Sequence, residues 1–132
     1  MIEANPAAAQ QPILVIEDES AVADFLRTAL ERHGYAVVVS ASAADGLQQL
    51  SSGEFRGVVS DVRMPGELSG VDVKEWLLRH RPELASRFVF ITGDTASAET
   101  VSLVAKAKTP CIEKPFRLQQ FLGMIEETIG KP

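Results

Sequence analysis

The chain has 132 residues, of which 45% are hydrophobic, a length sufficient for one buried core and too short for two ordinary domains. Its net charge of −5, without any run of Lys or Arg, argues against nucleic acid as a partner. No apolar stretch approaches the roughly 18 residues of a membrane span, and a single cysteine, Cys111, cannot form an intramolecular disulfide, so we expect a cytoplasmic protein without a membrane partner.

The amino-terminal residues 1–11 show no hydrophobic period and are predicted to form a flexible tail. From Pro12 onward, short apolar runs alternate with stretches of helical period. This alternation is typical of repeated strand–helix units around a parallel sheet. No boundary divides the rest of the chain, so we expect one domain over residues 12–130.

Five runs are predicted to be strands, most of them rich in Val, Ile and Phe: Ile13–Glu17, Ala36–Ser40, Gly57–Asp61, Phe88–Thr92 and Pro110–Glu113. Five helices are predicted between and after them. The first has Ser20 as its N-cap and Gly34 as its end. The others are expected over Ser42–Gly53, Val71–His80, Asp94–Ala107 and Arg117–Ile129.

This order of elements predicts a doubly wound α/β fold, with a five-stranded parallel sheet and helices on both faces. In such folds, ligands bind beyond the carboxyl ends of the strands. The first strand is followed there by Glu17 and Asp18, the third ends at Asp61, and Thr92 and Lys114 follow the fourth and fifth. Clustered carboxylates repel one another unless a cation neutralises them, and Mg²⁺ prefers oxygen ligands. We therefore expect a site that handles phosphate with a divalent cation.

Four sequence strings at four strand ends resemble the response-regulator receiver domains of two-component signalling. They are Ile13 to Glu19 (ILVIEDE), Asp61 to Pro65 (DVRMP) followed by Gly70, Thr92-Gly93, and Lys114-Pro115-Phe116. The resemblance extends from Pro12 to Ile129 and implies a flavodoxin-like receiver fold. Thr92-Gly93-Asp94 and the run Pro110 to Phe116 are similar to the receivers of hybrid histidine kinases in particular.

The resemblance implies that Asp61 accepts a phosphoryl group from a histidine kinase or a histidine phosphotransfer protein. By the same resemblance, Mg²⁺ or Mn²⁺ is held by Asp18 and Asp61 directly, by Glu17 through water and by the backbone carbonyl of Arg63. Thr92 and Lys114 contact the phosphoryl oxygens. These roles agree with general phosphoryl-transfer chemistry, in which a carboxylate attacks phosphorus while cations neutralise the equatorial oxygens.

Four positions are expected to modulate this chemistry. Gly93 leaves space for the phosphodonor, and Arg63 and Asp94 flank the path of the hydrolytic water. Cys111 stands where many relatives have an aromatic switch residue, and we expect it to be buried and inert. Signalling is expected to run through contacts with a downstream protein that the sequence does not identify, with no output domain after Ile129.

Two alternative functions make different demands on the sequence. A phosphohydrolase of the haloacid dehalogenase kind requires a second aspartate two residues after the nucleophile, where this chain has Arg63. A flavin-binding module requires a phosphate loop after the first strand, where the acids from Glu17 to Glu19 would repel the phosphate. We therefore expect a binding module, not an enzyme, with catalysis limited to its own phosphorylation and slow dephosphorylation.

Overall fold

The computed structural model describes residues 11–64, 66–93 and 109–132. Its five strands form one sheet in the order β2-β1-β3-β4-β5, and every neighbouring pair is parallel. The elements are β1 (Ile13–Ile16), α2 (Ser20–Arg32), β2 (Val37–Ser40), α3 (Ala43–Ser52), β3 (Gly57–Asp61), α4 (Gly70–His80), α5 (Pro82–Ala85), β4 (Phe88–Thr92), β5 (Cys111–Glu113) and α7 (Leu118–Thr128).

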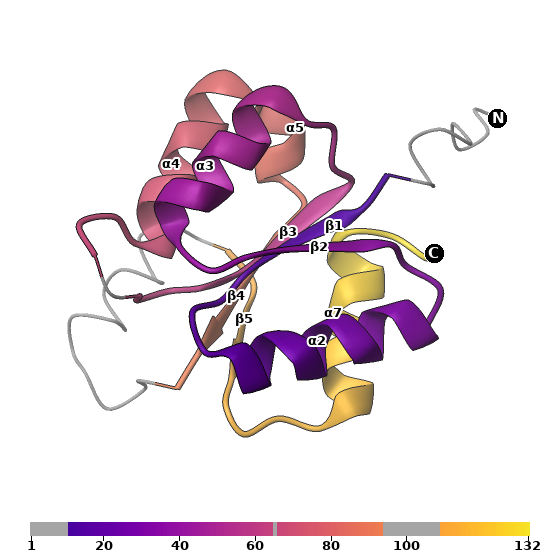
Figure 1. The fold of residues 1–132 in the computed structure, drawn as a ribbon. Coiled ribbons are helices and arrows are strands. Elements are labelled where there is room, and N and C mark those ends of the chain that lie inside the picture. Colours follow the sequence, from indigo (N-terminus) through magenta and orange to yellow (C-terminus); the bar gives the residue numbers. More distant parts are fainter. Residues whose placement is uncertain (1–10, 65, 94–108) are drawn as a thin grey trace, which may run out of the picture.

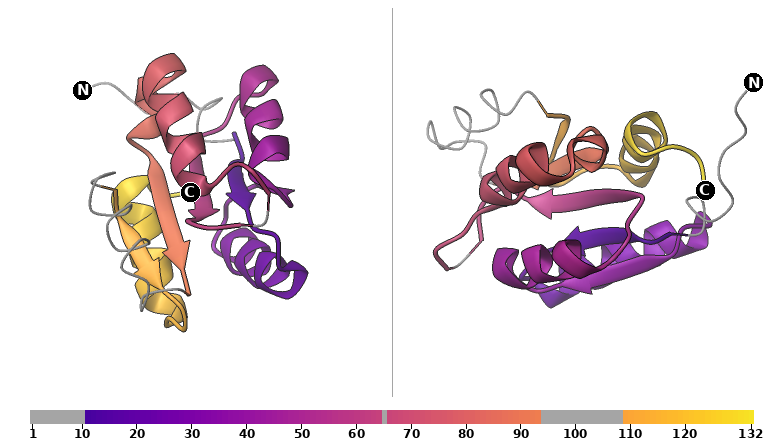
Figure 2. Two further views of the ribbon diagram at one scale, coloured as in Figure 1. Left: turned by 90° about the vertical axis from the view of Figure 1, so that its left-hand side faces the viewer. Right: turned by 90° about the horizontal axis from the view of Figure 1, so that it is seen from above.

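Helices cover both faces of the sheet, with α2 and α7 on one side and α3, α4 and α5 on the other (Figures 1 and 2). Strand β1 supplies both cores, since Ile13 and Val15 pack toward α2 and α7 while Leu14 and Ile16 pack toward α3 and α4. Trp76 of α4 packs against the core between α3, α4 and the sheet. The predicted doubly wound α/β fold is confirmed.

The start of α2 differs from the prediction by one residue. Ala23 donates its N–H to the carbonyl of Glu19 at 2.9 Å, so helical hydrogen bonding already begins at Glu19. Glu19 therefore occupies the cap position, without a side-chain cap bond, and Ser20 is the first helical residue and not the N-cap. The end of the helix agrees with the prediction, because Gly34 follows the C-cap with a φ of 109° that favours glycine.

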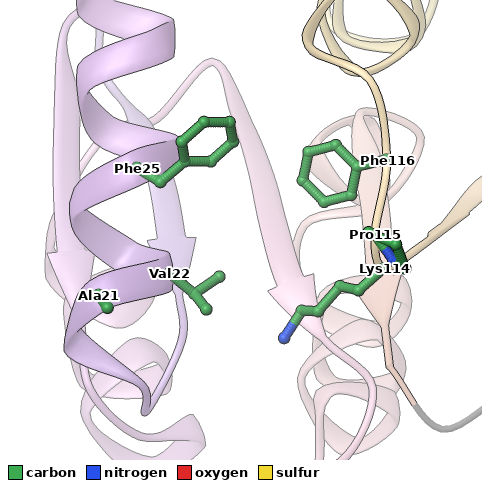
Figure 3. A pocket seen from close by; sticks show the side chains of 6 residues that line it. All are labelled: Ala21, Val22, Phe25, Lys114, Pro115 and Phe116. Carbon is green, nitrogen blue, oxygen red and sulfur yellow. The ribbon is translucent and has the colours of Figure 1, made fainter.

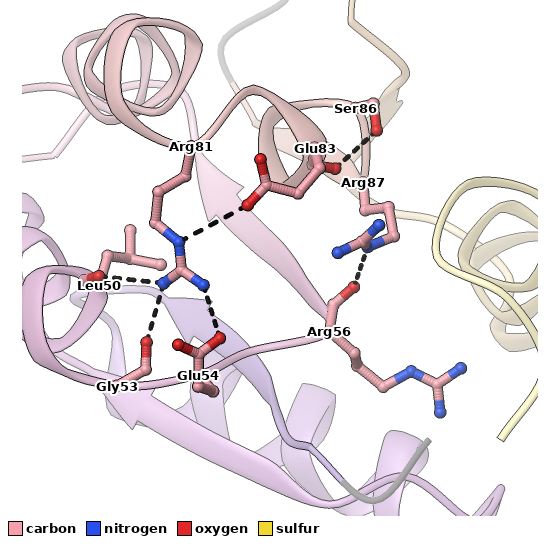
Figure 4. A network of polar contacts seen from close by, with 8 residues as sticks. All are labelled: Leu50, Gly53, Glu54, Arg56, Arg81, Glu83, Ser86 and Arg87. Carbon is pink, nitrogen blue, oxygen red and sulfur yellow. Dashed lines mark hydrogen bonds and ion pairs between the residues drawn. The ribbon is translucent and has the colours of Figure 1, made fainter. Parts of the chain in front are cut away.

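The short helix α5 was not predicted. It begins at Pro82 directly after α4, and its four residues are too few to show a helical period. Arg81 joins the two helices and reaches α3, where its guanidinium donates to the carbonyls of Gly53 at 2.8 Å and Leu50 at 3.2 Å (Figure 4). Figure 4 also shows Arg87, whose Nε donates to the carbonyl of Arg56 at 2.6 Å.

The last residues of the chain are fixed to the opposite end of the sheet from the acidic strand ends. The hydroxyl of Tyr35 donates to the carbonyl of Gly130, and Arg56 donates to the carbonyl of Lys131, each at 2.6 Å. Within the described part of the chain, no helix combines the length and the apolar content that crossing a bilayer requires. The predicted helix Asp94–Ala107 and residues 1–10 of the predicted tail lie outside the described residues.

Candidate functional site

Three carboxylates meet at the carboxyl edge of the sheet. Glu17 and Asp18 follow β1, and Asp61 is the last residue of the neighbouring strand β3. One carboxylate oxygen from each of the three lies within 4.8 Å of the others. Asp18 is exposed, whereas Glu17 and Asp61 are buried. The topology therefore brings together the acids that the sequence predicts as a cation site.

The ammonium of Lys114 lies between two of these acids. Its Nζ is 3.2 Å from Oδ2 of Asp61 and 3.3 Å from Oε1 of Glu17. Its backbone N–H donates to the carbonyl of Thr92 at 2.7 Å, which extends the pairing of β4 and β5 by one residue. Burial alone would lower the pKa of Lys114, but the carboxylates of Asp61 and Glu17 outweigh it and raise that pKa. The lysine is therefore a fixed positive charge in the site.

Glu17 is a buried acid with a raised pKa. Burial, together with the neighbouring Asp61 carboxylate, raises its pKa from 4.5 to about 7, although Lys114 acts in the opposite direction. Its second oxygen, Oε2, is buried and has no hydrogen-bond partner among the described residues. A buried, unpaired carboxylate oxygen is costly unless a further cation or water meets it. This orphaned oxygen, together with an all-oxygen donor set, fits a hard divalent cation.

The residues that surround Asp61 line a cleft of about 310 Å³: Glu19, Arg63, Thr92, Gly93 and Lys114. Thr92 ends β4 and is buried, while Arg63 and Gly93 are exposed. Four of the residues predicted from the strand ends and their loops therefore share this cleft with Asp61. Glu19 was not predicted to line it. The signal in the sequence was its position directly after the acidic pair, which also fits a charge in the first turn of a helix.

The loop after Asp61 folds back so closely that only glycine fits at its end. Gly70 donates its N–H to the carbonyl of Val62 at 2.9 Å. A Cβ at position 70 would collide with the carbonyl oxygen of Asp61 and would lie 2.8 Å from Oγ of Ser60. The buried hydroxyl of Ser60 donates to that same Asp61 carbonyl at 2.9 Å. Sequence reasoning gave no role to Ser60, because one buried serine in a strand carries no distinctive pattern.

Of two positions predicted to modulate the chemistry, the structure describes Cys111 but not Asp94. Cys111 begins β5 and is partly buried. Desolvation, aided by Glu113 and Asp61, raises the pKa of its thiol to about 11. The raised pKa keeps the thiol protonated near neutral pH, so the predicted inertness stays a prediction, whereas the predicted full burial is not met. Asp94 lies outside the described residues, so its expected pairing with Arg63 stays a prediction.

An apolar groove lies next to the cleft and shares Lys114 with it. Its walls are Ala21, Val22 and Phe25 from α2 and the run from Lys114 to Phe116 after β5, and it encloses about 340 Å³ (Figure 3). Phe25 and Phe116 face each other across it, with ring centroids 6.1 Å apart. Phe116 also packs on the fully buried Phe121 at 5.3 Å.

The strand order and the polar residues at one sheet edge define a doubly wound α/β protein with its site beyond the carboxyl ends of the strands. The family model of the response regulator receiver domain matches residues 13–126, and the chain belongs to this family. It is therefore a receiver domain of the two-component signalling type.

Two curated relatives come from Brucella abortus. The chain is 33% identical to the sensor kinase CckA over 131 residues, which are 98% of this chain and 14% of that protein. It is 30% identical to the response regulator receiver protein CpdR over 117 residues, which are 89% of this chain and 95% of CpdR. The chain thus spans a small part of the kinase and nearly all of the second relative.

Solved structures show the same architecture. The CheY-like receiver domain protein from Methanospirillum hungatei is 28% identical, with a TM-score of 0.79 over 90% of this chain and 93% of that one. A receiver domain protein from Clostridium thermocellum is 26% identical, with a TM-score of 0.77 over 90% and 94% of the two chains. The predicted family and fold are confirmed.

Proposed function

We propose that this chain takes a phosphoryl group onto Asp61 from a histidine kinase or a histidine phosphotransfer protein, in a reaction that depends on Mg²⁺ or Mn²⁺. The observation that carries the proposal is the contact of Lys114 with Asp61 at 3.2 Å beside three clustered carboxylates. This arrangement combines a carboxylate nucleophile with fixed positive charge, which phosphoryl transfer requires. Catalysis is limited to phosphorylation and slow dephosphorylation of the chain itself.

In this reaction, an oxygen of the Asp61 carboxylate attacks phosphorus while the bond from phosphorus to the donor imidazole breaks. The electron pair of that bond leaves with the imidazole nitrogen. Lys114 stabilises the charge on the phosphoryl oxygens, and the Thr92 hydroxyl donates a hydrogen bond to one of them. Gly93 has no side chain that would block the approach of the donor.

The cation would be held by Asp18 and Asp61, with Glu17 acting through water and Arg63 contributing its backbone carbonyl. A bound Mg²⁺ would neutralise negative charge as the phosphoryl group approaches the acids. The orphaned Oε2 of Glu17 supports a further polar or ionic partner at this place. The raised pKa of Glu17 supports the same assignment, because burial and then the neighbouring Asp61 carboxylate disfavour its charged form, and a nearby cation would offset both effects.

Partners are proposed from the family and its chemistry. The phosphodonor carries a phosphorylated histidine, and the downstream partner is a protein that distinguishes phosphorylated from unphosphorylated Asp61. Sensor kinase CckA and receiver protein CpdR, as relatives, support a place in a chain of phosphoryl transfers.

The test is incubation of the chain with acetyl phosphate and Mg²⁺, followed by intact-mass spectrometry. One phosphoryl group should appear, stable in acid and labile in base, as expected for an acyl phosphate. Asp61→Asn should abolish the label, whereas Asp24→Asn, which changes an exposed acid paired with Arg27 on α2, should leave it intact. Unchanged labelling of Asp61→Asn would show that another residue is the nucleophile.

A further inference from the structure

We propose that Phe116 is a positioning residue that holds the Lys114 ammonium against Asp61 and Glu17. The inference rests on the proposed function and assigns a role to an aromatic side chain outside the acidic cluster. It begins from the question of what keeps a flexible lysine side chain at the junction of two carboxylates.

The main chain at Lys114 is hydrogen-bonded on its amino side, whereas on its carboxyl side it continues into Pro115, which has no N–H to donate. Its N–H binds the carbonyl of Thr92 at 2.7 Å, and its side-chain stem passes Gly93, where an added Cβ would lie 3.6 Å from Cδ of Lys114. After Lys114 the sheet ends, and α7 begins only at Leu118. The N–H groups of Phe116 and Arg117 donate no hydrogen bond to any residue that the structure describes. Between Pro115 and α7, side-chain packing is therefore the main contact with the core that the described residues supply.

Phe116 is the residue placed to provide that packing. Its ring lies 5.3 Å from the ring of Phe121, which is fully buried in the core between α2, α7 and the sheet. On its other side, the apolar groove leaves the Lys114 stem open toward α2 (Figure 3). The Phe116 ring is thus the side chain of this groove wall that ties the loop after Lys114 to the buried core.

Phe25 provides a matched comparison. It lines the opposite wall of the same groove, is 48% exposed, and takes no part in the contact between Phe116 and Phe121. If the groove mattered only as apolar surface, truncating either ring would have the same effect. If Phe116 positions Lys114, the two truncations will differ.

The experiment compares Phe116→Ala, Phe116→Leu and Phe25→Ala with the unaltered chain, well below their melting temperatures. Phe116→Ala should slow labelling by acetyl phosphate roughly ten-fold or more, since about 1 Å of misplacement can cost about 100-fold. Phe116→Leu should recover most of the rate because leucine still packs on Phe121. Phe25→Ala should label at the original rate. An unchanged rate in Phe116→Ala, or an equal loss in Phe25→Ala, would overturn the proposal.

A second readout does not depend on phosphorylation. In the metal-free protein, the nuclear Overhauser cross-peak between the Lys114 ε-methylene and the Asp61 β-methylene should be present in the unaltered chain. It should vanish in Phe116→Ala and persist in Phe25→Ala. A cross-peak that survives in Phe116→Ala would overturn the proposal. If the unaltered chain takes no phosphoryl group, the proposed function fails, and this cross-peak still decides the role of Phe116.

Discussion

The Nζ atom of Lys114 lies 3.2 Å from Oδ2 of Asp61, although their strands are not neighbours in the sheet. Asp61 ends β3 and Lys114 follows β5, so the ion pair bridges the end of β4, where Thr92 lies. Lys114 therefore joins three strand ends by two contacts, its ion pair with Asp61 and the hydrogen bond from its N–H to the carbonyl of Thr92. A change in charge at Asp61 will therefore alter the ion pair with Lys114 and, through Lys114, the hydrogen bond at the end of β4.

The acidic cluster predicts that Mg²⁺ stabilises the protein. Because Glu17, Asp18 and Asp61 repel one another, the melting temperature should rise with Mg²⁺ concentration. At ten times the dissociation constant, the free energy of unfolding should have increased by about 1.4 kcal/mol. Asp18→Asn and Asp61→Asn should stabilise the metal-free form and weaken the response. Differential scanning calorimetry with NaCl at matched ionic strength separates binding from screening. A melting temperature indifferent to tens of millimolar Mg²⁺ contradicts the site.

The raised pKa of Glu17 predicts a pH dependence in the metal-free protein. The pKa is about 7 in the folded state and near 4.5 in the unfolded chain, so folding favours the protonated acid. The resulting stabilisation is fully present below about pH 4.5 and is lost as the pH rises through about 7. At about 1.4 kcal/mol per pKa unit, it amounts to a few kcal/mol at most.

Denaturant titrations between these pH values, with a chelator present, provide the measurement. Glu17→Gln should flatten the decline in unfolding free energy relative to the unaltered chain. Glu31→Gln, an exposed change on α2, should leave the decline as it was. If the free energy of unfolding falls equally with pH in Glu17→Gln and in the unaltered chain, folding does not raise the pKa of Glu17.

The same substitution should have opposite effects at two glycines. Gly123 lies in α7 with no atom near the position of an added Cβ, so Gly123→Ala should stabilise the protein by about 0.5–1 kcal/mol. In Gly70→Ala, the new Cβ would collide with the carbonyl of Asp61, and we expect a loss of about 1–3 kcal/mol. Thermal unfolding measures both. Equal effects would mean that the loop after Asp61 shifts freely.

Removing the Arg81 side chain, which lies far from the acidic cluster, should lower the free energy of unfolding markedly. Arg81→Ala removes the donors to the carbonyls of Gly53 and Leu50, so we expect a loss of about 1–3 kcal/mol. Glu54→Ala removes only a partner whose side chain is 72% exposed and should cost about 0–1 kcal/mol. Urea unfolding distinguishes the two, and a similar cost for both would assign the effect to the ion pair with Glu54 and not to the carbonyls.

Much of the fold and the position of the site could be predicted because buried parallel strands have a distinctive composition and their carboxyl ends meet at one edge. The acids after β1 and β3 were expected together for this reason. The Lys114-Pro115-Phe116 string predicted Lys114 at the site, but its contacts with both Asp61 and Glu17 depend on the path of a flexible side chain across β4. The role of Glu19 as the cap of α2 was missed because serine is the better capping residue by type, and the backbone begins the helix earlier.

Other features depend on contacts between distant parts of the chain. Tyr35 and Gly130 are 95 positions apart, and nothing in either local sequence indicates their hydrogen bond. Helix α5 shows the opposite difficulty, since its four residues form little more than one helical turn, so that no hydrophobic spacing repeats within it. Such short or long-range features become visible only when the packed structure is known.

The two layers of helices each contain one natural optical probe. The single tryptophan, Trp76, packs against the α3–α4 core, whereas the single tyrosine, Tyr35, is buried in the α2–α7 core. Trp76 fluorescence therefore reports on one side of the sheet, and the part of the near-ultraviolet dichroism that Tyr35→Phe removes reports on the other. Coincident transitions would show that both sides melt as one cooperative unit, without any label being introduced.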